Sequence, residues 1–555
     1  MLLILACIVE LPRPALQGDP DHDWDHDGVT ERDGDCNDGY ASVHPGADEL
    51  CNDRDDDCDD VVDEDAIDEL EWYVDDDDDG YGAGDGWPGC DQPAGWVGLR
   101  GDCDDENAEV NPDAEEICGD GLDNDCDASA EGCGWSGQVD LAEADLVLDG
   151  EAGDLQGFDL TTGDLDDDGE LDLVLGRPAR DDKDGQLVVL TGSDFDDELL
   201  VIDGSDSMVL AAQVAWSPDL TGDGASNVVA SAGLYQTSSG SAWVLAAGDT
   251  TLEEAWAYTP EDPVHAGAGV ATLGDWDGDG VGELAVGSDD YDGSALDEGA
   301  VMLFFGPLTP GARVTEADLV LEGLTPEHVG DIIAGVGDLD GDGRSELAVG
   351  AESHKETGKS TGAVFLFDDP TLRGTHTLDD VARSVIGDDG DLLGSAVADA
   401  GDVDADGYDD LVVGSMEGGF AALIFGPVAN DARLDQAGVR ITGTGQLGYR
   451  VHGGFDFDAD GRSDVALGAP GPDGTLDGGS VFLLLGRSEW GGVEATQDAD
   501  AQFLGEEEGA RAGNAMTSGD VDDDTFDDLL IAAPYASQAG SDAGRVYLLY
   551  GGLGL

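Results

Sequence analysis

Residues 401–414 read Gly-Asp-Val-Asp-Ala-Asp-Gly-Tyr-Asp-Asp-Leu-Val-Val-Gly, an aspartate-rich loop followed by a short apolar run. Seven loops of this kind occur in the chain, and the intervals between them are 55, 56, 63, 64, 54 and 64 residues. They begin at Asp164, Asp219, Asp275, Asp338, Asp402, Asp456 and Asp520. A unit of this length that recurs seven times indicates a repeat architecture.

Each loop has the composition of a calcium site. In the fifth loop, carboxylates stand at positions 1, 3, 5 and 9, where they repel one another unless a cation lies among them. Hard oxygen ligands of this type suit Ca²⁺, and the glycine at position 6, Gly407, allows the chain to turn around the ion. Position 7 is expected to contribute only its backbone carbonyl, so its side chain is free to vary. Seven solvated acidic turns are the alternative, and seven copies in register favour calcium.

The predicted ligands differ little between the loops. In order from position 1 to position 9 they are Asp164, Asp166, Asp168, Glu170 and Asp172; Asp219, Thr221, Asp223 and Asn227; Asp275, Asp277, Asp279, Val281 and Glu283; Asp338, Asp340, Asp342, Arg344 and Glu346; Asp402, Asp404, Asp406, Tyr408 and Asp410; Asp456, Asp458, Asp460, Arg462 and Asp464; and Asp520, Asp522, Asp524, Phe526 and Asp528. Two loops depart from the pattern. The second has Thr221 at position 3 and Asn227 at position 9, and whether it binds calcium is open. The seventh has Thr525 in place of glycine, so weaker binding is expected there.

The segments between the loops predict strands. A helix would follow the loop of an EF-hand, whereas short apolar runs bounded by glycine, such as residues 411–414, follow these loops. Three further apolar runs in most units bring the expected number to four strands per unit. Four strands in each of seven units predict an all-β fold, a seven-bladed β-propeller, which leaves only short strand edges exposed.

The unit at residues 401–414 resembles the FG-GAP repeat, which builds the seven-bladed propeller at the head of integrin α subunits. The resemblance covers roughly residues 140–555. It implies Ca²⁺ bound in the loops on one face of the propeller, and ligand recognition by surface loops. Residues 145–150 resemble the strand at 320–323, and no such strand follows Tyr550. The strand at 145–150 is therefore expected to complete the last blade.

Residues 21–133 differ in composition and contain two tandem units. Each unit opens with a D-x-D-x-D-G loop that is followed by a Gly-Asp-Cys tripeptide. The loops supply the candidate metal ligands Asp23, Asp25, Asp27, Asp75, Asp77 and Asp79. These units resemble the MopE-type metal-binding repeat and, in style, the calcium repeats of thrombospondin type 3. The sequence therefore predicts a small calcium-loop module, whose few apolar residues require disulfides and ions for stability.

The cysteines cluster in this module. Eight of the nine lie in it and none lies in the predicted propeller; the eight are Cys36, Cys51, Cys58, Cys90, Cys103, Cys118, Cys126 and Cys133. An even set of this kind predicts a disulfide framework formed in an oxidising compartment, and its connectivity is open. Zinc binding is the alternative, but the spacings lack paired C-x₂-C knuckles.

The N-terminal residues favour an exported protein. Residues 4–7, Ile-Leu-Ala-Cys, resemble a bacterial lipobox, so residues 1–7 are interpreted as a truncated signal with a lipid anchor at Cys7. An apolar N-terminus with an isolated cysteine is the alternative. Residues 8–20 would be a tether and residues 134–139 a linker to the propeller. No run of 18 apolar residues predicts a transmembrane span.

The net charge of the chain limits the kinds of partner that the protein can bind. With 129 acidic and 20 basic residues the net charge is −109, which disfavours nucleic-acid partners. No sequence cluster combines a base, a nucleophile and an orienting group, so catalytic residues are not predicted. The sequence favours an extracellular, non-enzymatic binding or adhesion protein with an unknown protein or glycan ligand. A propeller enzyme with a site in its central channel or loops, or a metal-sequestering surface protein, remains open.

Overall fold

The computed structural model describes residues 19–552 except for several short stretches. The residues left out are 76, 78, 106, 109, 113–125, 127–135, 180–183, 193–194, 196, 206–208, 234–239, 247–248, 250, 253–255, 259–265, 290, 294–297, 309–315, 325–328, 357, 430, 472–477 and 523. The chain divides into two compact units, an N-terminal unit up to Cys133 and a C-terminal unit from Gly134 onward.

Seven sheets of four or five strands form the described part of the C-terminal unit, together with one short hairpin. In the order in which their strands pair, the sheets are β6 (Leu160–Gly163), β7 (Asp172–Arg177), β8 (Gln186–Thr191) and β9 (Asp197–Asp203); β10 (Leu210–Ser217), β11 (Asn227–Gly233), β12 (Gly240–Ala246) and β13 (Trp256–Tyr258); β14 (Ala266–Thr272), β15 (Leu284–Ser288), β16 (Ala300–Phe304), β17 (Leu319–Glu322) and β23 (Gly374–Thr377); β18 (Ile333–Val336), β19 (Glu346–Ala351), β22 (Ala363–Phe367), β24 (Arg383–Ile386) and β28 (Ala432–Arg433); β25 (Ala396–Gly401), β26 (Asp410–Ser415), β27 (Phe420–Ile424), β29 (Gly438–Thr442) and β33 (Val493–Glu494); β30 (Arg450–Phe455), β31 (Asp464–Ala469), β32 (Ser480–Leu484), β34 (Ala501–Leu504) and β4 (Gly137–Asp140); and β35 (Ala515–Gly519), β36 (Asp528–Ala533), β37 (Arg545–Leu549) and β5 (Leu146–Asp149).

The remaining elements of this unit are short. They are the hairpin of β20 (Lys355–Glu356) and β21 (Lys359–Ser360), the helices α2 (Leu378–Val381), α3 (Leu434–Ala437) and α4 (Ala495–Asp498), and the 3-10 turn η2 (Leu141–Glu143). The predicted all-β fold is therefore confirmed. The strand-forming segments are the apolar runs that flank the loops, in agreement with the sequence.

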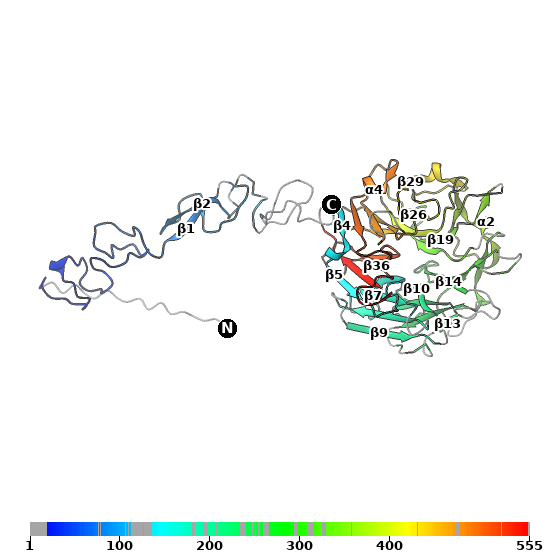
Figure 1. Ribbon diagram of the computed structural model, residues 1–555, viewed down its shortest axis with the longest axis horizontal. Helices are drawn as coiled ribbons and strands as arrows, with labels where there is room; N and C mark the ends of the chain where they lie inside the picture. The colour runs from blue at the N-terminus through cyan, green and yellow to red at the C-terminus, as the bar shows by residue number, and fades with distance from the viewer. Residues whose placement is uncertain are drawn as a thin grey trace. The chain divides into compact units, whose positions relative to one another are not determined.

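The seven sheets close into a ring. Each pair of neighbouring sheets shares one cluster of buried apolar side chains, and the seven clusters lead around the ring back to the starting sheet. The first strands of neighbouring sheets also lie against one another, and the series returns from β35 to β6. Figure 1 shows these sheets arranged around a common centre, the arrangement of a β-propeller.

Burial explains why the strands after the loops are almost entirely apolar. Every residue of β19, β26, β31 and β36 is buried, because each of these strands has sheets packed on both of its faces. Continuous apolar runs are typical of strands covered on both faces, whereas strands with one wet face alternate.

The ends of the unit meet in the last sheet. β5 pairs antiparallel with β37, with Asp149 opposite Arg545, so the strand near residue 146 completes this sheet as the sequence predicted. The guanidinium of Arg545 reaches the Asp149 carboxylate at 2.6 Å. β4 adds a second tie, because it pairs in parallel with β34 of the neighbouring sheet.

Outer strands from neighbouring repeats were not predicted. β23, β28 and β33 each pair in parallel with the fourth strand of the preceding sheet. These strands have two to four residues, too few to show a periodic pattern in the sequence. They cover edges that would otherwise expose unpaired backbone groups.

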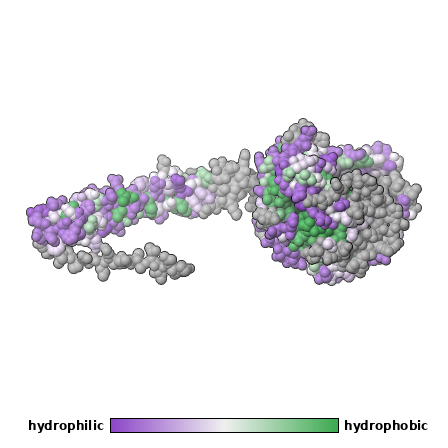
Figure 2. Space-filling model, turned by 60° about the horizontal axis from the view of Figure 1, so that its bottom comes forward, coloured by the Kyte–Doolittle hydropathy of each residue, from purple (hydrophilic) through white to green (hydrophobic). Residues whose placement is uncertain are grey.

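The N-terminal unit contains little regular structure. Its elements are the 3-10 turn η1 (Glu31–Asp33) and one sheet in the order β2 (Ala83–Gly89), β1 (Leu70–Val74) and β3 (Trp96–Val97). Its buried apolar side chains, within the described residues, are Val43, Ala66, Tyr73 and Val110. Figure 2 shows a mostly hydrophilic surface with small hydrophobic areas over this unit. So small a core needs other sources of stability.

Disulfides supply part of that stability. Three are present among the described residues, Cys36–Cys58, Cys51–Cys90 and Cys103–Cys126. The first and third occupy equivalent places in the two repeats, and the second joins the repeats. The predicted disulfide framework is thus confirmed for six cysteines, while Cys7, Cys118 and Cys133 lie outside the described residues. No helix in the described part of the chain is long and apolar enough to cross a membrane.

Candidate metal centres

The seven aspartate loops occupy the same place in all seven sheets. Each loop connects the first strand of its sheet to the second, and position 9 stands at the start of the second strand or just before it. In the fifth sheet, for example, the loop runs from the end of β25 to Asp410, the first residue of β26. Consecutive loops therefore lie on the same face of the ring.

The side chain at position 9 fixes the conformation of its loop by a hydrogen bond. In all seven loops its side chain accepts a hydrogen bond from the backbone N–H of position 2, over 2.6–3.1 Å. The pairs are Leu165 with Asp172, Leu220 with Asn227, Trp276 with Glu283, Leu339 with Glu346, Val403 with Asp410, Phe457 with Asp464, and Val521 with Asp528. Asn227 does this as well as a carboxylate, because only an acceptor oxygen is required.

The sequence reasoning missed the role of position 2. All seven residues there are apolar and at most 5% exposed, so each anchors its loop in the core between two sheets. The signal was present, since Leu, Leu, Trp, Leu, Val, Phe and Val follow the first aspartate of the seven loops.

Positions 1, 3 and 5 are arranged by the backbone of the loop. In the fifth loop, Asp402 accepts hydrogen bonds from the N–H groups of Asp406 and Gly407, at 3.0 and 2.9 Å. Asp404 accepts a further one from Asp406 at 3.1 Å, and Asp406 accepts one from the N–H of position 7 at 3.0 Å. The fourth and sixth loops repeat this pattern. The backbone thus fixes the side chains of three aspartates within one short loop.

Burial disfavours the ionised form of the carboxylates at position 9. It raises the pKa of Asp410 and Asp528 to about 7 and that of Asp464 to about 8, and nearby aspartates of the same loop raise the pKa further. Burial likewise raises the pKa of Glu283 and Glu346 to about 7. A divalent cation among these groups would stabilise their ionised forms, and an all-oxygen donor set fits Ca²⁺.

The second loop departs from the pattern without losing the framework. Asp219 still accepts hydrogen bonds from the N–H groups of Gly222 and Gly224, at 2.7 and 2.9 Å. The hydroxyl of Thr221 is buried and has no hydrogen-bond partner among the described residues. An oxygen in this state at position 3 fits a neutral ligand to a cation.

The seventh loop contains backbone strain. Thr525 has a φ of 81°, in the left-handed region, where the six other loops place glycine. β-branched residues rarely adopt this conformation because Cβ approaches the backbone.

Thr525→Gly is therefore expected to stabilise the protein by roughly 1–2 kcal/mol and to tighten Ca²⁺ binding by the seventh loop. Thermal unfolding with and without Ca²⁺ measures both effects. Gly407→Thr, the reverse change in the fifth loop, should lower stability by a similar amount. A lower melting temperature for Thr525→Gly would contradict the assignment of strain.

An arginine from outside the fourth loop, Arg383 in β24, contacts the carboxylates of this loop. The guanidinium of Arg383 lies 3.2 Å from Asp340 at position 3, 3.0 Å from Glu346 at position 9, and 3.0 Å from Asp368. Its side chain is 14% exposed, so water screens these contacts weakly. Since Arg383 already neutralises two predicted ligands, it should compete with a cation at this loop.

Arg383→Gln is expected to raise the Ca²⁺ affinity of the fourth loop about tenfold or more, because removal of a nearby positive charge favours the cation. In Ca²⁺-free solution the same change should destabilise the protein, since it leaves buried carboxylates unpaired. Equilibrium dialysis at low free Ca²⁺ and thermal unfolding measure the two effects. Lys359→Gln, which removes an exposed charge from β21, is the control. Unchanged Ca²⁺ uptake in Arg383→Gln would show that the arginine does not compete.

Neighbouring loops are joined directly. The backbone N–H of position 8 donates to the position 1 carbonyl of the preceding loop in four cases, over 2.6–3.2 Å. The pairs are Gly282 with Asp219, Asp409 with Asp338, Ser463 with Asp402, and Asp527 with Asp456. In two of these pairs the contact is reciprocal, because Asp409 and Asp527 accept from the N–H of Asp338 and Asp456 at 2.6 and 2.8 Å. The conformation of one loop therefore bears on the next.

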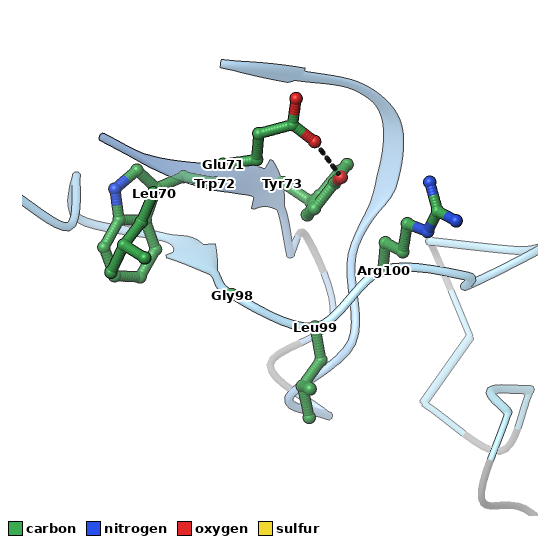
Figure 3. A pocket seen from close by; sticks show the side chains of 7 residues that line it. All are labelled: Leu70, Glu71, Trp72, Tyr73, Gly98, Leu99 and Arg100. Carbon is green, nitrogen blue, oxygen red and sulfur yellow. Dashed lines mark hydrogen bonds between the residues drawn. The ribbon is translucent and has the colours of Figure 1, made fainter. Parts of the chain in front are cut away.

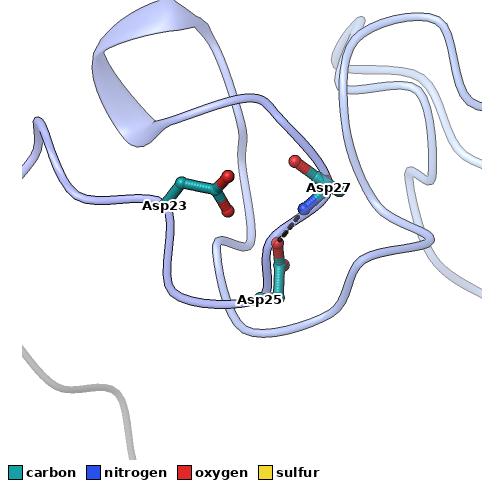
Figure 4. Close-up of side chains that lie close together, drawn as sticks. All are labelled: Asp23, Asp25 and Asp27. Atoms are coloured by element: carbon teal, nitrogen blue, oxygen red, sulfur yellow. Dashed lines mark hydrogen bonds between the residues drawn. The ribbon is translucent and has the colours of Figure 1, made fainter.

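The predicted ligands of the N-terminal unit also converge. Figure 4 shows the side chains of Asp23, Asp25 and Asp27 around a shared space, and one potential ligand atom from each lies within 4.8 Å of the others. Asp75, Asp77 and Asp79 form the equivalent group. Three further groups contain carboxylates that were not predicted as ligands, with Asp25 the exception: Asp25, Asp35 and Asp38; Glu49, Asp55 and Asp57; and Asp57, Asp59 and Glu64.

Two hollows lie in the described part of the chain. One, of about 550 Å³, lies in the N-terminal unit between β1 and the segment 98–100, and Figure 3 shows Leu70, Trp72 and Leu99 on its wall. Leu70 and Leu99 are more than half exposed, so part of this wall is apolar. A smaller hollow of about 120 Å³ is lined by first strands of five sheets at the centre of the ring, with Asp331 and Arg450 among its residues.

One histidine–serine pair joins two of the first strands. Nε2 of His452 in β30 lies 2.8 Å from the hydroxyl of Ser518 in β35. Burial lowers the pKa of His452 to about 4, so the ring is neutral near pH 7 and is a weak base. The two residues stand 66 positions apart, and only the ring of sheets brings them together.

Comparison with known proteins identifies both kinds of repeat. Residues 330–367, 447–484 and 512–549 match the FG-GAP repeat. Residues 35–64 and 102–131 match the MopE-type family described as "Putative metal-binding motif". Both predicted resemblances are confirmed.

Curated relatives include integrin α subunits at modest identity. The chain is 30% identical to integrin alpha-PS2 of Drosophila melanogaster over 230 residues, which cover 36% of this chain and 15% of the relative. It is 33% identical to human integrin alpha-IIb over 150 residues, or 24% and 14% of the two chains. Human phosphatidylinositol-glycan-specific phospholipase D is 31% identical over 183 residues, or 29% and 21%.

These matches span about a fifth or less of the relatives' own length. They therefore cover only a part of each relative. The chain thus carries integrin α-like FG-GAP repeats in an all-β C-terminal unit, preceded by two MopE-type metal-binding motifs.

Proposed function

We propose that this chain is an exported, calcium-binding adhesion or binding protein whose propeller presents the recognition surface to a protein or glycan ligand. The observation that carries the proposal is the common framework of the seven loops, in which position 9 holds position 2 in every copy. Backbone hydrogen bonds join neighbouring loops, so Ca²⁺ bound in one loop would also support the loop beside it. The similarity to integrin α subunits supports an adhesion role.

Ca²⁺ would act here as a structural ion. Bound at positions 1, 3, 5 and 9, it would offset the repulsion among carboxylates and keep the loop backbones in one conformation. The three disulfides support an oxidising, extracellular location, and residues 1–7 support a lipid anchor at Cys7 followed by a tether over residues 8–20.

Metal analysis tests the calcium part of the proposal. The full chain is dialysed against micromolar Ca²⁺, and the bound metal is measured per chain with single Asp-to-Asn variants at position 1 of each loop. We expect five to seven ions to depend on these loops. Two or fewer such ions would contradict the proposal.

A ligand screen tests the recognition part. The intact, Ca²⁺-loaded protein is applied to arrays of glycans and of extracellular proteins, and the screen is repeated with a chelator. Binding that is specific, saturable and lost on chelation supports the proposal. Specific binding that survives complete Ca²⁺ removal would show that ligand recognition does not depend on Ca²⁺ in the loops.

An enzymatic function is the second candidate, and the His452–Ser518 contact favours it. A histidine in this contact could take the serine proton as the hydroxyl attacks, and its pKa of about 4 makes it a weak base for that step. A serine-reactive fluorophosphonate probe tests this directly. Labelling that is lost in both Ser518→Ala and His452→Gln would favour the enzyme, and an unlabelled wild-type protein would leave Ser518 as a structural residue.

A further inference from the structure

We propose that carboxylates from two separate motifs complete one calcium site in each repeat of the N-terminal unit. The site of the first repeat joins Asp25 and Asp27 of the D-x-D-x-D-G loop to Asp35 and Asp38 of the segment around Cys36. The site of the second repeat joins Asp75, Asp77 and Asp79 to Asp102. The inference deepens the calcium-binding part of the proposed function and does not depend on the propeller ligand.

The first argument is geometric. Asp25, Asp35 and Asp38 each place a carboxylate oxygen within 4.8 Å of those of the other two, although Asp25 and Asp38 are 13 positions apart in the sequence. Asp35 is 4% exposed and Asp38 is 8% exposed. Three carboxylates brought so close, two of them almost completely buried, repel one another strongly without a counter-ion.

The second argument concerns single oxygen atoms. Oδ1 of Asp35 accepts the N–H of Asn37 at 2.7 Å, and Oδ1 of Asp38 accepts that of Trp24 at 2.7 Å. Oδ2 of each is buried without a hydrogen-bond partner in the described part of the chain. Asp25 and Asp27 show the same division, with Oδ1 bonded to backbone and Oδ2 buried and unpartnered. Buried polar atoms are normally satisfied, so four unpartnered oxygens in one group point to a bound cation.

The second repeat reproduces this pattern independently. Oδ1 of Asp77, Asp79 and Asp102 accepts the N–H of the residue two positions later, at 3.3, 2.8 and 2.8 Å. Oδ2 of these three and Oδ1 of Asp75 are buried and have no partner among the described residues. The connector between loop and Gly-Asp-Cys segment is 15 residues longer here, because β2 and β3 are inserted between Gly80 and Gly101. Three of these oxygens, on Asp77, Asp79 and Asp102, correspond to those of Asp25, Asp27 and Asp35, and they are left without a partner despite this insertion, which indicates a shared ligand.

The chemistry of the donor set selects the ion. All donors are carboxylate oxygens, which suit Ca²⁺, whereas copper and zinc prefer imidazole or thiolate. The nearest sulfurs in sequence, those of Cys36 and Cys103, are held in disulfides and are not thiolates. These disulfides tie the Gly-Asp-Cys segments to later parts of their repeats, and so help to position Asp35 and Asp102.

Calcium counting on the full-length protein tests the proposal. We compare the wild type with Asp35→Asn, Asp38→Asn and the double variant. Asp33→Asn is the control, because Asp33 is exposed and its substitution removes the same charge. The double variant is expected to bind one Ca²⁺ fewer per chain. Each single variant should weaken one site about tenfold or more, and the control should match the wild type.

Terbium luminescence locates the lost ion. Trp24 lies within the loop and its backbone contacts Asp38, so it should sensitise Tb³⁺ bound at this site. Trp24→Phe should lose this emission but bind as many ions as the wild type. The double variant Asp35→Asn with Asp38→Asn should lose the emission and bind one ion fewer. Disulfide mapping shows whether Cys36–Cys58 still forms, and if the double variant fails to form it, the single variants decide.

Three results would overturn the proposal. They are wild-type stoichiometry and affinity in the double variant, unchanged affinity in both single variants, and stoichiometric Cu²⁺ that Ca²⁺ cannot displace. Asp404→Asn separates this inference from the proposed function. If Asp404→Asn loses an ion and the double variant does not, only the N-terminal site is wrong; if the wild type binds no Ca²⁺, both proposals fail.

Discussion

Chelation of Ca²⁺ should lower the melting temperature of the C-terminal unit more than any single substitution in it. Ions that bind the folded loops and not the open chain stabilise by about 2.7 kcal/mol per site at a concentration one hundred times Kd. Several sites act on one closed ring, so their contributions accumulate. Differential scanning calorimetry of the full chain, with excess chelator and with millimolar Ca²⁺, measures the change.

Two variants of the fifth loop provide the control. Asp404→Asn removes a charged ligand at position 3 and should reduce the Ca²⁺-dependent part of the stability. Tyr408→Ala at position 7 removes only a side chain, so it should shift the melting temperature equally with and without Ca²⁺. Restoration by Mg²⁺ should be poor, because Mg²⁺ demands tighter octahedral geometry and keeps its water. Equal Ca²⁺ dependence in the two variants would contradict the assignment of ligands.

Reduction of the disulfides should unfold the N-terminal unit and leave the C-terminal unit folded. The N-terminal unit buries few apolar side chains, and three disulfides connect its segments. Loss of a native disulfide typically costs a small domain 2–5 kcal/mol, which exceeds what so small a core can offset. The C-terminal unit has no cysteine, so the reductant has nothing to act on there.

Limited proteolysis after reduction, with Ca²⁺ present throughout, tests this expectation. Fragments that begin near residue 134 and resist further digestion are expected. Thiol counting on denatured, unreduced protein from its native host should find none of the eight cysteines from Cys36 to Cys133 free. Eight free thiols would contradict the extracellular location, and digestion of both units at equal rates would contradict their independence.

The sequence by itself determined the repeat, the strands and the candidate ion loops. Apolar runs after each loop predicted β-strands correctly, because strands buried on both faces need continuous apolar residues. The pattern D-x-D-x-D-G is equally local, since a short loop that gathers its own carboxylates carries its chemistry within a few residues. The missing last strand predicted that β5 joins β37, because a ring leaves no sheet incomplete.

Only the tertiary structure decided the contacts between distant residues. The guanidinium of Arg383 reaches Asp340 and Glu346 from a different strand. The local sequence of the fourth loop does not predict this contact. The Gly-Asp-Cys segments were recognised as repeats but not as partners of the loops before them. Contacts of this kind depend on how turns and disulfides bring separate segments together, and a connector may change length, as it does between Gly80 and Gly101, without changing where its ends meet.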